Sequence, residues 1–428
     1  MTYNEAIQYL YDALPMYQRV GASAYKADLS NSHKLDTYFN IPHHLFRSVH
    51  VAGTNGKGSV SHMLASVFQH AGYKTGLYTS PHLLDFRERI KVNGRMVSKD
   101  FVTEFVKNNL SYFKHLKPSF FEITVFMAFC FFAKQKVDIA IIETGLGGRL
   151  DSTNILKPIA SVITNIGLDH TNFLGNTLEK IALEKAGIIK ENTPVIIGET
   201  QPETTPVFQS VAMKTDSKIS FADFRYKVQY RMQVSDHTIE YHLTNGQTIK
   251  TDLKGSYQAK NVCTALETLD VICNILPVTR NAVEKGFENI VKTTGLLGRW
   301  QEISCNPLVI CDTAHNKEGI NEVVRQIQNT AYKHLHLILG FVDDKNIEEL
   351  LQLFPVHATF YLTECSVPRS TKLTVLENIS TKLQLEARLF ENVKDAYITA
   401  KSNADSQDMI FIGGSTFVAA DILSFQKK

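Results

Sequence analysis

The chain has 428 residues, of which 44% are hydrophobic and 21% are charged, and its 45 basic side chains nearly balance 43 acidic ones. This length predicts two or three domains, each large enough to bury its own core. The net charge of +2 excludes a general electrostatic attraction to nucleic acid or to an anionic membrane, so any anionic ligand must be held by local groups.

The beginning of the chain and its most apolar stretch both argue against membrane insertion. The N-terminal segment carries Glu5 and Asp12 and lacks the basic and apolar regions of a signal peptide. The stretch 120–133 contains Glu122 and is shorter than the roughly 20 residues that span a bilayer. The six cysteines are scattered, which favours reduced thiols over disulfides or a zinc site. We therefore expect a soluble cytoplasmic protein with no membrane partner.

Short apolar runs alternate along the chain with longer segments of helical period, which is typical of a mostly parallel α/β sheet. Because ligands bind at the carboxyl ends of strands in such sheets, the residues directly after these runs are candidates for a site. The expected strands are 48–52, 139–142, 160–164, 195–197, 308–311, 335–339, 359–363 and 409–412.

The glycine-rich segment Gly53-Thr-Asn-Gly-Lys-Gly-Ser59 follows the first expected strand and precedes an amphipathic helix. A strand, a glycine-rich turn and a helix start form a phosphate cradle, because backbone N–H groups and the helix N-terminus favour an anion. Lys57 is placed to reach the terminal phosphates and Ser59 to lie near a metal ion. Val51 stands at the first glycine position of the usual pattern, so an ordinary βα turn is the alternative. The apolar positions of the helix are Val60, Met63, Leu64, Val67, Phe68 and Ala71.

Glu143 and His170 follow the next two strands, where each strand ends. Adjacent parallel strands bring both side chains to the edge of the sheet that carries the glycine-rich turn, where they are available to a divalent metal. Mg²⁺ prefers oxygen ligands, and for each residue alone a buried hydrogen bond is an equal alternative. The segment 178–189 predicts a helix with Glu184 and Lys185 near its end, which composition alone assigns to an exposed face.

Between residues 219 and 253 apolar and polar residues alternate, and Asn245-Gly246 is a strong hairpin signal. This predicts an antiparallel meander, including Phe221 and Phe224, packed on the first domain. The segment 292–298 has two glycines and no period, which predicts a linker before a second α/β domain.

Six motifs, in this order, resemble those of the folylpolyglutamate synthase/dihydrofolate synthase family of Mur-type ATP-dependent ligases. The resemblance and the strand pattern predict an α/β fold with a P-loop-containing, mostly parallel sheet domain and a small antiparallel meander, followed by a smaller Rossmann-like α/β domain. The ATP-binding domain would span 1–295 and the glutamate-ligase domain 299–428. The motifs are Gly53 to Ser59, Tyr78-Thr-Ser-Pro-His82, Glu143-Thr-Gly-Leu-Gly-Gly-Arg-Leu-Asp151, Ile166-Gly-Leu-Asp-His170, Glu184-Lys-Ala-Gly187 and Asp312-Thr-Ala-His-Asn316.

The resemblance also implies site residues in a cleft between the two domains. Two Mg²⁺ ions would be bound by Ser80, Glu143 and His170. The catalytic residues would be Lys57, Lys185 and His315, and Lys185 matches a family lysine that reacts with CO₂ to become a carbamate. The residues that would bind ATP are Thr54, Asn55, Gly56, Lys57, Gly58, Ser59, Asn261, Arg299 and Asp312.

Contacts to the folate or pteroate substrate are assigned by position in the same way. Phe120 is suited to stack on a pterin ring and equally suited to the core. Three departures from the family pattern, Tyr257, Leu297 and Thr313, replace a usual His, Pro and Gly and affect local loop geometry. The expected contacts are Lys26, Ala27, Asp28, Ser119, Phe120 and Leu150.

The implied reaction joins the amino group of L-glutamate to a carboxylate of a reduced folate or of dihydropteroate, with ATP split to ADP and phosphate. The carboxylate takes the γ-phosphoryl group of ATP to form an acyl phosphate, and the amine then displaces phosphate. Mg²⁺, Lys57 and His315 would neutralise the charge that develops. We expect a monomer, and the sequence leaves open which acceptor is preferred.

Two alternatives remain beside this reaction. Mur-type ligases of cell-wall precursors usually place a UDP-sugar domain before the phosphate loop, and only 52 residues precede Gly53. The second alternative is an ATP-binding module that has lost ligase activity. This hypothesis predicts the loss of at least one of four residues, and all four are present: Lys57, Glu143, His170 and Lys185.

Overall fold

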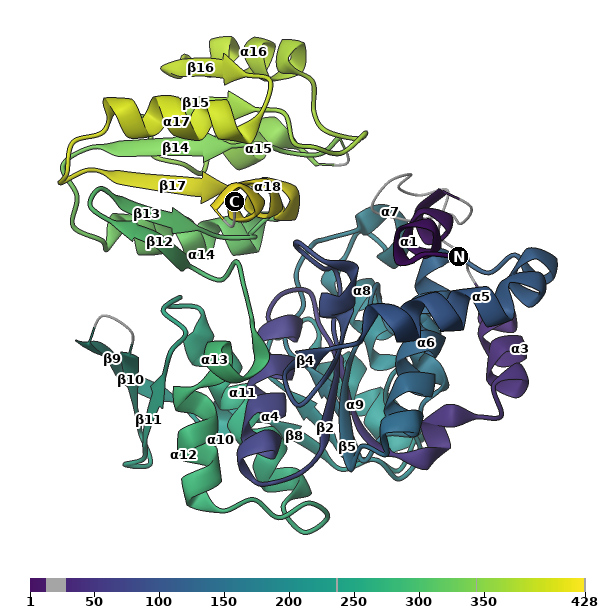
Figure 1. Cartoon of the computed structure of the whole chain (residues 1–428). Helices are drawn as coiled ribbons and strands as arrows, with labels where there is room; N and C mark the ends of the chain where they lie inside the picture. Colours follow the sequence, from purple (N-terminus) through teal and green to yellow (C-terminus); the bar gives the residue numbers. More distant parts are fainter. Residues whose placement is uncertain (13–27, 236–237, 344, 427–428) are drawn as a thin grey trace. The chain divides into compact units, whose positions relative to one another are not determined.

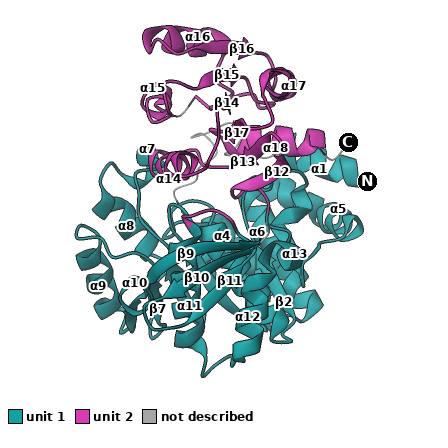
Figure 2. Cartoon of the chain, turned by 90° about the vertical axis from the view of Figure 1, so that its left-hand side faces the viewer, with its two compact units in different colours: residues 1–253, 258–296 teal, residues 254–257, 297–428 magenta. Residues whose placement is uncertain are grey.

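The computed structural model describes residues 1–12, 28–235, 238–343 and 345–426. The chain forms two compact units, one of residues 1–253 and 258–296 and the other of residues 254–257 and 297–428 (Figure 2). The ATP-binding role assigned to 1–295 and the glutamate-ligase role assigned to 299–428 stay predictions. None of the helices in the described parts of the chain has the length and apolarity that a membrane span requires.

The first unit is built on a mixed sheet in the order β4-β3-β2-β5-β1-β6-β7-β8 (Figure 1). The strands from β2 to β8 in that order run parallel, and β3 and β4 are antiparallel additions at one edge. The central parallel strands are buried on both faces, which explains their continuous apolar runs. The strands are β1 Arg47–Ala52, β2 Thr75–Tyr78, β3 Ile90–Val92, β4 Arg95–Met96, β5 Ile139–Glu143, β6 Ala160–Ile163, β7 Val195–Ile197 and β8 Ile219–Phe221.

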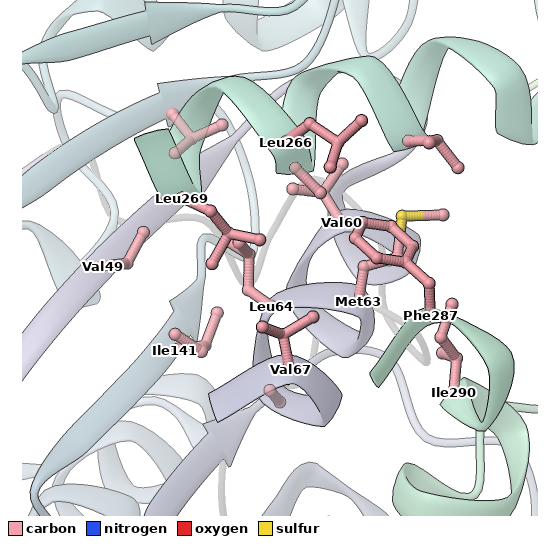
Figure 3. Packing of buried hydrophobic residues seen from close by; sticks show 14 of the residues in the cluster. Val49, Val60, Met63, Leu64, Val67, Ile141, Leu266, Leu269, Phe287 and Ile290 are labelled. Carbon is pink, nitrogen blue, oxygen red and sulfur yellow. The ribbon is translucent and has the colours of Figure 1, made fainter. Parts of the chain in front are cut away.

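Helices cover this sheet and form separate apolar clusters with it. One cluster joins β1 and β5 to α4, α11 and α12 (Figure 3), and another is rich in phenylalanine from α6. The larger helices are α1 Tyr3–Asp12, α3 Ser30–Tyr38, α4 Lys57–His70, α5 Lys99–Leu116, α6 Phe120–Gln135, α8 Leu178–Ala186, α9 Thr205–Lys214, α11 Gln258–Ile272 and α12 Arg280–Glu288. The short ones are η2 Pro42–Leu45, η3 Phe86–Arg89, η4 Ser152–Ile155, α7 Thr171–Leu174, α10 Ala222–Arg225 and α13 Ile290–Thr294.

The expected amphipathic helix after the glycine-rich turn is confirmed as α4. Its predicted apolar positions are buried except for Ala71, which lies at the C-cap. Leu64 and Val67 of this helix pack with Val49 of β1 and Phe287 of α12 (Figure 3). The start of α4 is thus fixed against the sheet, directly after β1.

The antiparallel meander is confirmed in part. Strands β9 Val228–Ser235, β10 Thr238–Leu243 and β11 Thr248–Thr251 form a three-stranded sheet, with the Asn245-Gly246 turn between β10 and β11. The prediction is wrong for its beginning, because Ile219–Phe221 forms β8 of the main sheet and Phe224 of α10 is exposed. A short apolar run has the same sequence pattern in a parallel edge strand and in a meander. The strand with which it pairs therefore decides the assignment.

The linker prediction is wrong for residues 292–294, which belong to α13. The Asp252 carboxylate accepts hydrogen bonds from the N–H groups of Ile290 (3.1 Å) and Val291 (2.8 Å) at the start of this helix. These partners are distant in sequence, so local composition gives no signal for them. The helix ends at Gly295, whose φ of +67° suits a residue without a side chain.

The second unit is a six-stranded sheet in the order β12-β13-β17-β14-β15-β16. Only β12 is antiparallel to its neighbour. Every expected strand of the chain is present, with bounds that differ by at most one residue. The strands are β12 Gln301–Cys305, β13 Leu308–Cys311, β14 Leu335–Leu339, β15 Thr359–Thr363, β16 Ala387–Phe390 and β17 Met409–Gly413; the helices are α14 Lys317–Gln328, α15 Ile347–Leu351, α16 Leu373–Lys382, α17 Val393–Asn403 and α18 Thr416–Gln426.

Candidate active site

The candidate site of the first unit lies where three neighbouring parallel strands end. Strand β1 pairs with β5, with Val51 opposite Glu143, and with β6, with Ala52 opposite Ile163. Three parts of the candidate site therefore lie at the same sheet edge, as expected for adjacent parallel strands. They are the glycine-rich turn, Glu143 and the start of the segment that leads to His170.

The glycine-rich turn has a shape that requires its glycines. Gly56 has a φ of +85°, and a Cβ there would overlap the amide oxygen of Asn261. A Cβ at Gly53 would overlap the hydroxyl of Thr164. Lys57 folds back on the turn, where its Nζ donates to the carbonyl oxygens of Gly53 (2.9 Å) and Thr54 (3.1 Å).

A segment after β6 holds the other side of the turn, and sequence reasoning did not assign it this role. The Thr54 hydroxyl accepts a hydrogen bond from the Gly167 N–H at 2.9 Å, and the Asn55 N–H donates to Asn165 Oδ1 at 2.8 Å. The sequence feature that could have indicated this role is the polar residues directly after the apolar strand. These hydrogen bonds tie the turn to the segment after β6.

Two residues of α11 approach the first turn of α4. Gln258 Nε2 donates to the buried Ser59 hydroxyl at 3.2 Å, and Asn261 Nδ2 donates to Gln258 Oε1 at 2.8 Å. Residues three apart share a helix face, so the Gln-x-x-Asn spacing presents both amides together. The structure thus brings the predicted nucleotide contact Asn261 beside the turn, and Gln258 is an addition to the predicted set.

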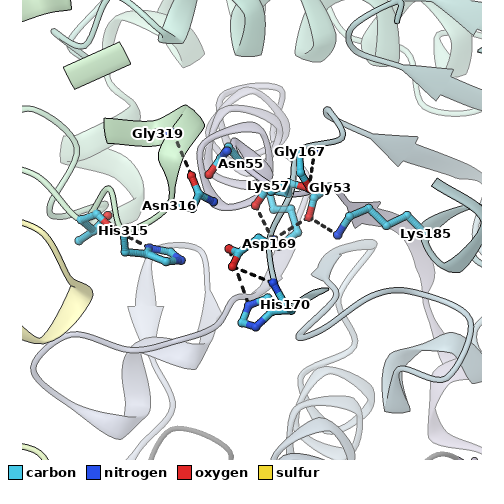
Figure 4. A network of polar contacts seen from close by, with 12 residues as sticks. Gly53, Asn55, Lys57, Gly167, Asp169, His170, Lys185, His315, Asn316 and Gly319 are labelled. Atoms are coloured by element: carbon cyan, nitrogen blue, oxygen red, sulfur yellow. Dashed lines mark hydrogen bonds and ion pairs between the residues drawn. The ribbon is translucent and has the colours of Figure 1, made fainter. Parts of the chain in front are cut away.

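Ser80 and Glu143, two of the expected metal ligands, are in direct contact. The Ser80 N–H donates to Glu143 Oε2 at 3.0 Å, and the Glu143 carboxylate is buried. A buried carboxylate beside a serine fits the oxygen preference of Mg²⁺. His170 is the N-cap residue of α7, and its Nε2 lies 3.9 Å from Asp169 Oδ2 (Figure 4). Within the described residues no group of three or more His, Cys, Asp or Glu side chains could hold a metal ion; the expected ligand set contains two such side chains, Glu143 and His170.

Lys185 lies in the last turn of α8 and is buried, with 4% exposure. Its Nζ donates to the Gly53 carbonyl oxygen at 2.8 Å (Figure 4). Burial, with repulsion from Lys57, lowers the pKa of Lys185 to about 7, and Asp169 and Asp151 oppose the shift only partly. The interpretation as an exposed charged face is therefore wrong for Lys185.

The Asp151 carboxylate orders the glycine-rich segment that follows Glu143. It accepts hydrogen bonds from the N–H groups of Gly145 (2.8 Å), Leu146 (2.9 Å) and Thr153 (3.0 Å). Burial raises the pKa of this carboxyl group. Leu150, which precedes Asp151 in the sequence, is half-buried.

The second unit gathers its predicted residues on the loop after β13 and the turn before β12. Arg299 donates to the Gly298 carbonyl oxygen at 3.1 Å and to the Thr313 hydroxyl. His315 Nδ1 lies 3.0 Å from the Thr313 carbonyl oxygen. Asn316 caps α14 by accepting the Gly319 N–H at 2.9 Å (Figure 4). Thr313 thus adds a partner for Arg299 that a glycine lacks.

The predicted folate contacts divide into three groups. Lys26 and Ala27 lie outside the described residues, and the Asp28 carboxylate accepts the Ser30 N–H at 2.8 Å. Ser119 is the N-cap of α6, and its hydroxyl accepts the Glu122 N–H at 3.2 Å. Phe120 is 2% exposed, its ring centre 5.7 Å from that of Tyr11. The structure gives Ser119 and Phe120 structural roles, and their contact with a pterin stays a prediction.

Comparison with known proteins gives matches along most of the chain. The family model of the Mur ligase middle domain matches residues 51–269, and that of the Mur ligase glutamate ligase domain matches residues 298–416. The dihydrofolate synthase/folylpolyglutamate synthase of Bacillus subtilis is 32% identical over 93% of this chain and 94% of its own length. A probable bifunctional folylpolyglutamate synthase/dihydropteroate synthase of Haloferax volcanii is 29% identical over 98% of this chain, which spans only 50% of that relative.

Solved structures match the whole chain. The E. coli FolC in complex with DHPP and ADP has a TM-score of 0.85 and 27% identity, and the match covers 100% of this chain and 98% of that one. A bifunctional folylpolyglutamate synthase/dihydrofolate synthase with Mn, AMPPNP and L-glutamate bound has a TM-score of 0.84 and 26% identity, with the same coverage.

Proposed function

Because the chain belongs to the folylpolyglutamate synthase/dihydrofolate synthase family of Mur ligases, we propose that it is an ATP-dependent ligase that joins L-glutamate to a carboxylate of a reduced folate or of dihydropteroate. The observation that carries this proposal is the convergence of the glycine-rich turn, the Ser80–Glu143 pair and buried Lys185 at one sheet edge. Relatives with bound ADP, DHPP, AMPPNP and L-glutamate support it.

The turn from Gly53 to Ser59 binds the phosphates of ATP. Its glycines let backbone N–H groups approach the phosphates, and the start of α4 favours negative charge. The Lys57 amine, which is bonded to two loop carbonyl oxygens, exchanges these for phosphate oxygens. Asn261, Arg299 and Asp312 bind other parts of the nucleotide, as the resemblance implies.

A divalent cation is held by the Ser80 hydroxyl, the Glu143 carboxylate and His170, and the buried carboxylate–serine contact fits such an ion. The bound cation neutralises phosphate charge during transfer. The manganese in a relative's structure supports a divalent metal. The proposal includes that the physiological ion is Mg²⁺ and that two Mg²⁺ ions are bound.

Lys185 reacts with CO₂ to form a carbamate. A pKa of about 7 leaves a large neutral fraction of this amine near neutral pH, and only the neutral amine has the lone pair that attacks carbon. The new N–C bond forms as one C=O π bond of CO₂ opens to C–O⁻, and the nitrogen passes one proton to solvent, so a neutral buried amine becomes an anionic carbamate. That anion would lie beside the turn, near Lys57, and would assist in binding the cation.

The reaction proceeds by transfer of the γ-phosphoryl group to the folate carboxylate, followed by attack of the glutamate amine on the acyl phosphate. Lys57 holds the transferring phosphoryl group, and positioning supplies most of the rate. His315 Nδ1 must carry the proton in its contact with the Thr313 carbonyl oxygen, because a carbonyl oxygen can only accept.

The proposal is tested with the purified chain, ATP, Mg²⁺ and labelled L-glutamate, with dihydropteroate and tetrahydrofolate assayed side by side. We expect label in the pterin product with at least one acceptor. Transfer of label to a UDP-sugar precursor and to neither pterin would favour the cell-wall alternative, and no transfer to any acceptor would favour an inactive ATP-binding module.

A further inference from the structure

A four-residue segment, 254–257, belongs to the second unit although the chain on both sides of it belongs to the first. The second unit binds this segment closely. The Ser256 N–H donates to Gln326 Oε1 at 2.6 Å, and Gln326 Nε2 donates to the Lys254 carbonyl oxygen at 3.1 Å. Lys254 Nζ also lies 2.6 Å from Glu302 Oε2. The segment is therefore an ordered part of the second unit.

The last residue of the segment, Tyr257, has its ring and its hydroxyl both fixed. A Cβ at Gly255 would overlap three carbons of the Tyr257 ring, so the ring lies directly on the Gly255 backbone. The hydroxyl donates to Asp312 Oδ2 at 2.6 Å. A side chain at position 255 would therefore displace the Tyr257 ring.

The Asp312 carboxylate has Tyr257 as a side-chain donor and two backbone donors. Its Oδ2 also accepts the Trp300 N–H at 2.7 Å, and its Oδ1 accepts the Ala314 N–H at 2.8 Å. Asp312 is 2% exposed. Burial raises the pKa of Asp312, and the Tyr257 hydrogen bond and the Arg299 charge oppose the rise. The buried thiol of Cys311 is a further titratable neighbour.

We propose that Tyr257 is a positioning residue that keeps the Asp312 carboxylate oriented and ionised for nucleotide binding. The inference rests on the proposed function, which assigns Asp312 to ATP. An anionic carboxylate repels phosphates, so the groups it binds are hydroxyl or amino donors of the nucleoside. Oδ2 already accepts two donors, so Oδ1, which accepts one, is the oxygen with room for such a group; a protonated carboxyl group would lose an acceptor site.

The successor of Tyr257 in the sequence, Gln258, donates to the Ser59 hydroxyl of the first unit. Consecutive residues thus each bond to a residue assigned to nucleotide binding. Helix α11 begins at Gln258. Tyr257 is therefore the residue directly before the helix, and its position depends on where the helix starts.

The test compares Tyr257→Phe with the wild-type full chain. Loss of one hydrogen bond to a charged group predicts a rise of roughly tenfold in KM for ATP, with kcat within about twofold of wild type. The pH below which KM for ATP rises should move upward, since Asp312 loses a group that favours its ionised form. Tyr257→His, which keeps a ring N–H donor, should restore much of the affinity.

The matched control is Tyr397→Phe, which removes the hydroxyl of another buried tyrosine of the second unit, packed on Phe425. This variant should leave KM for ATP unchanged. In an Asp312→Asn background, Tyr257→Phe should have little further effect on KM. An equally large effect in that background would show a purely structural role and overturn the inference.

The outcomes separate this inference from the proposed function. A wild-type chain that forms no glutamylated product contradicts the proposed function. An active wild-type chain whose Tyr257→Phe variant has an unchanged KM for ATP and an unchanged pH profile contradicts the role of Tyr257. If Tyr257→Phe does not fold, Tyr257→Met takes its place as the variant without a donor. A KM for ATP that is raised in Tyr257→Met and close to wild type in Tyr257→His supports the role, and equal KM values in these two variants contradict it.

Discussion

Lys185 Nζ donates a hydrogen bond of 2.8 Å to the carbonyl oxygen of Gly53, a residue 132 positions earlier in the chain. The contact joins the last turn of α8 to the first residue of the glycine-rich turn. It places a buried amine with a pKa near 7 next to Lys57. A permanently charged amine at this position would repel Lys57, whereas an amine with a lowered pKa is neutral for part of the time.

Carbamylation of Lys185 predicts an effect of pH and of CO₂ on activity. The neutral fraction of the amine rises as pH passes upward through about 7, so activity and incorporation of labelled bicarbonate should both increase over that range. Lys185→Ala should lose most activity and give no carbamate signal. Lys180→Ala, which removes an exposed lysine of the same helix, is the control. A Lys185→Ala enzyme with wild-type turnover would exclude the carbamate role.

Removal of the Lys57 amine should impair phosphoryl transfer much more than folding. In Lys57→Met the methylene chain is kept, and the lost contacts are to two loop carbonyl oxygens. We expect kcat to fall about 10²–10³-fold, the scale for one preorganised group that stabilises developing charge. Steady-state kinetics and the melting temperature measure the two effects separately. A variant with normal kcat would show that Lys57 does not act on the transferring phosphoryl group.

Gly56→Ala should weaken ATP binding, and Gly246→Ala is a control of nearly equal backbone conformation. The φ angles are +85° and +83°, so both substitutions should lower the free energy of unfolding by roughly 1–2 kcal/mol. At Gly56 the added Cβ would also overlap the Asn261 amide, whereas nothing lies within 4 Å at Gly246. Calorimetric titration with ADP should show reduced affinity for Gly56→Ala alone. Equal affinities in both variants would contradict the proposed fit of turn and amide.

Two substitutions at Ser119 separate its role as a helix cap from its predicted contact with the substrate. Ser119→Ala removes the N-cap of α6 and should lower the free energy of unfolding by about 1 kcal/mol. Ser119→Asn keeps a capping oxygen and should retain most of that stability. We expect both variants to raise KM for dihydropteroate, measured with saturating ATP and glutamate. An unchanged KM in both would leave Ser119 with the cap role and contradict the contact.

The sequence predicts the fold well where local pattern decides the structure. Apolar runs placed the central strands to within one residue, because a strand buried on both faces needs a continuous apolar segment. The assignment failed at Ile219–Phe221, where the partner strand β7 and not the pattern decides. It failed again at α13, whose start is stabilised by the distant Asp252.

For the candidate site, the sequence locates the residues that follow strands. It does not identify the residues that form hydrogen bonds with them and fix their positions. Glu143 was found because a polar residue directly after an apolar run is conspicuous, and Asp312 was assigned through the family resemblance. Asp151 and Tyr257 contact their partners through folding of separate segments, which no single window of sequence contains. The burial of Lys185 was contrary to composition, since a Glu-Lys pair in a helix is usually exposed.

The most direct measurement is the dependence of ADP release on both co-substrates. With ATP and Mg²⁺ present, we predict that the purified chain forms ADP only when a pterin carboxylate acceptor and L-glutamate are supplied together, with one glutamylated product for each ADP. ADP release at the same rate without L-glutamate, or without the acceptor, would contradict a ligase that couples ATP cleavage to amide formation.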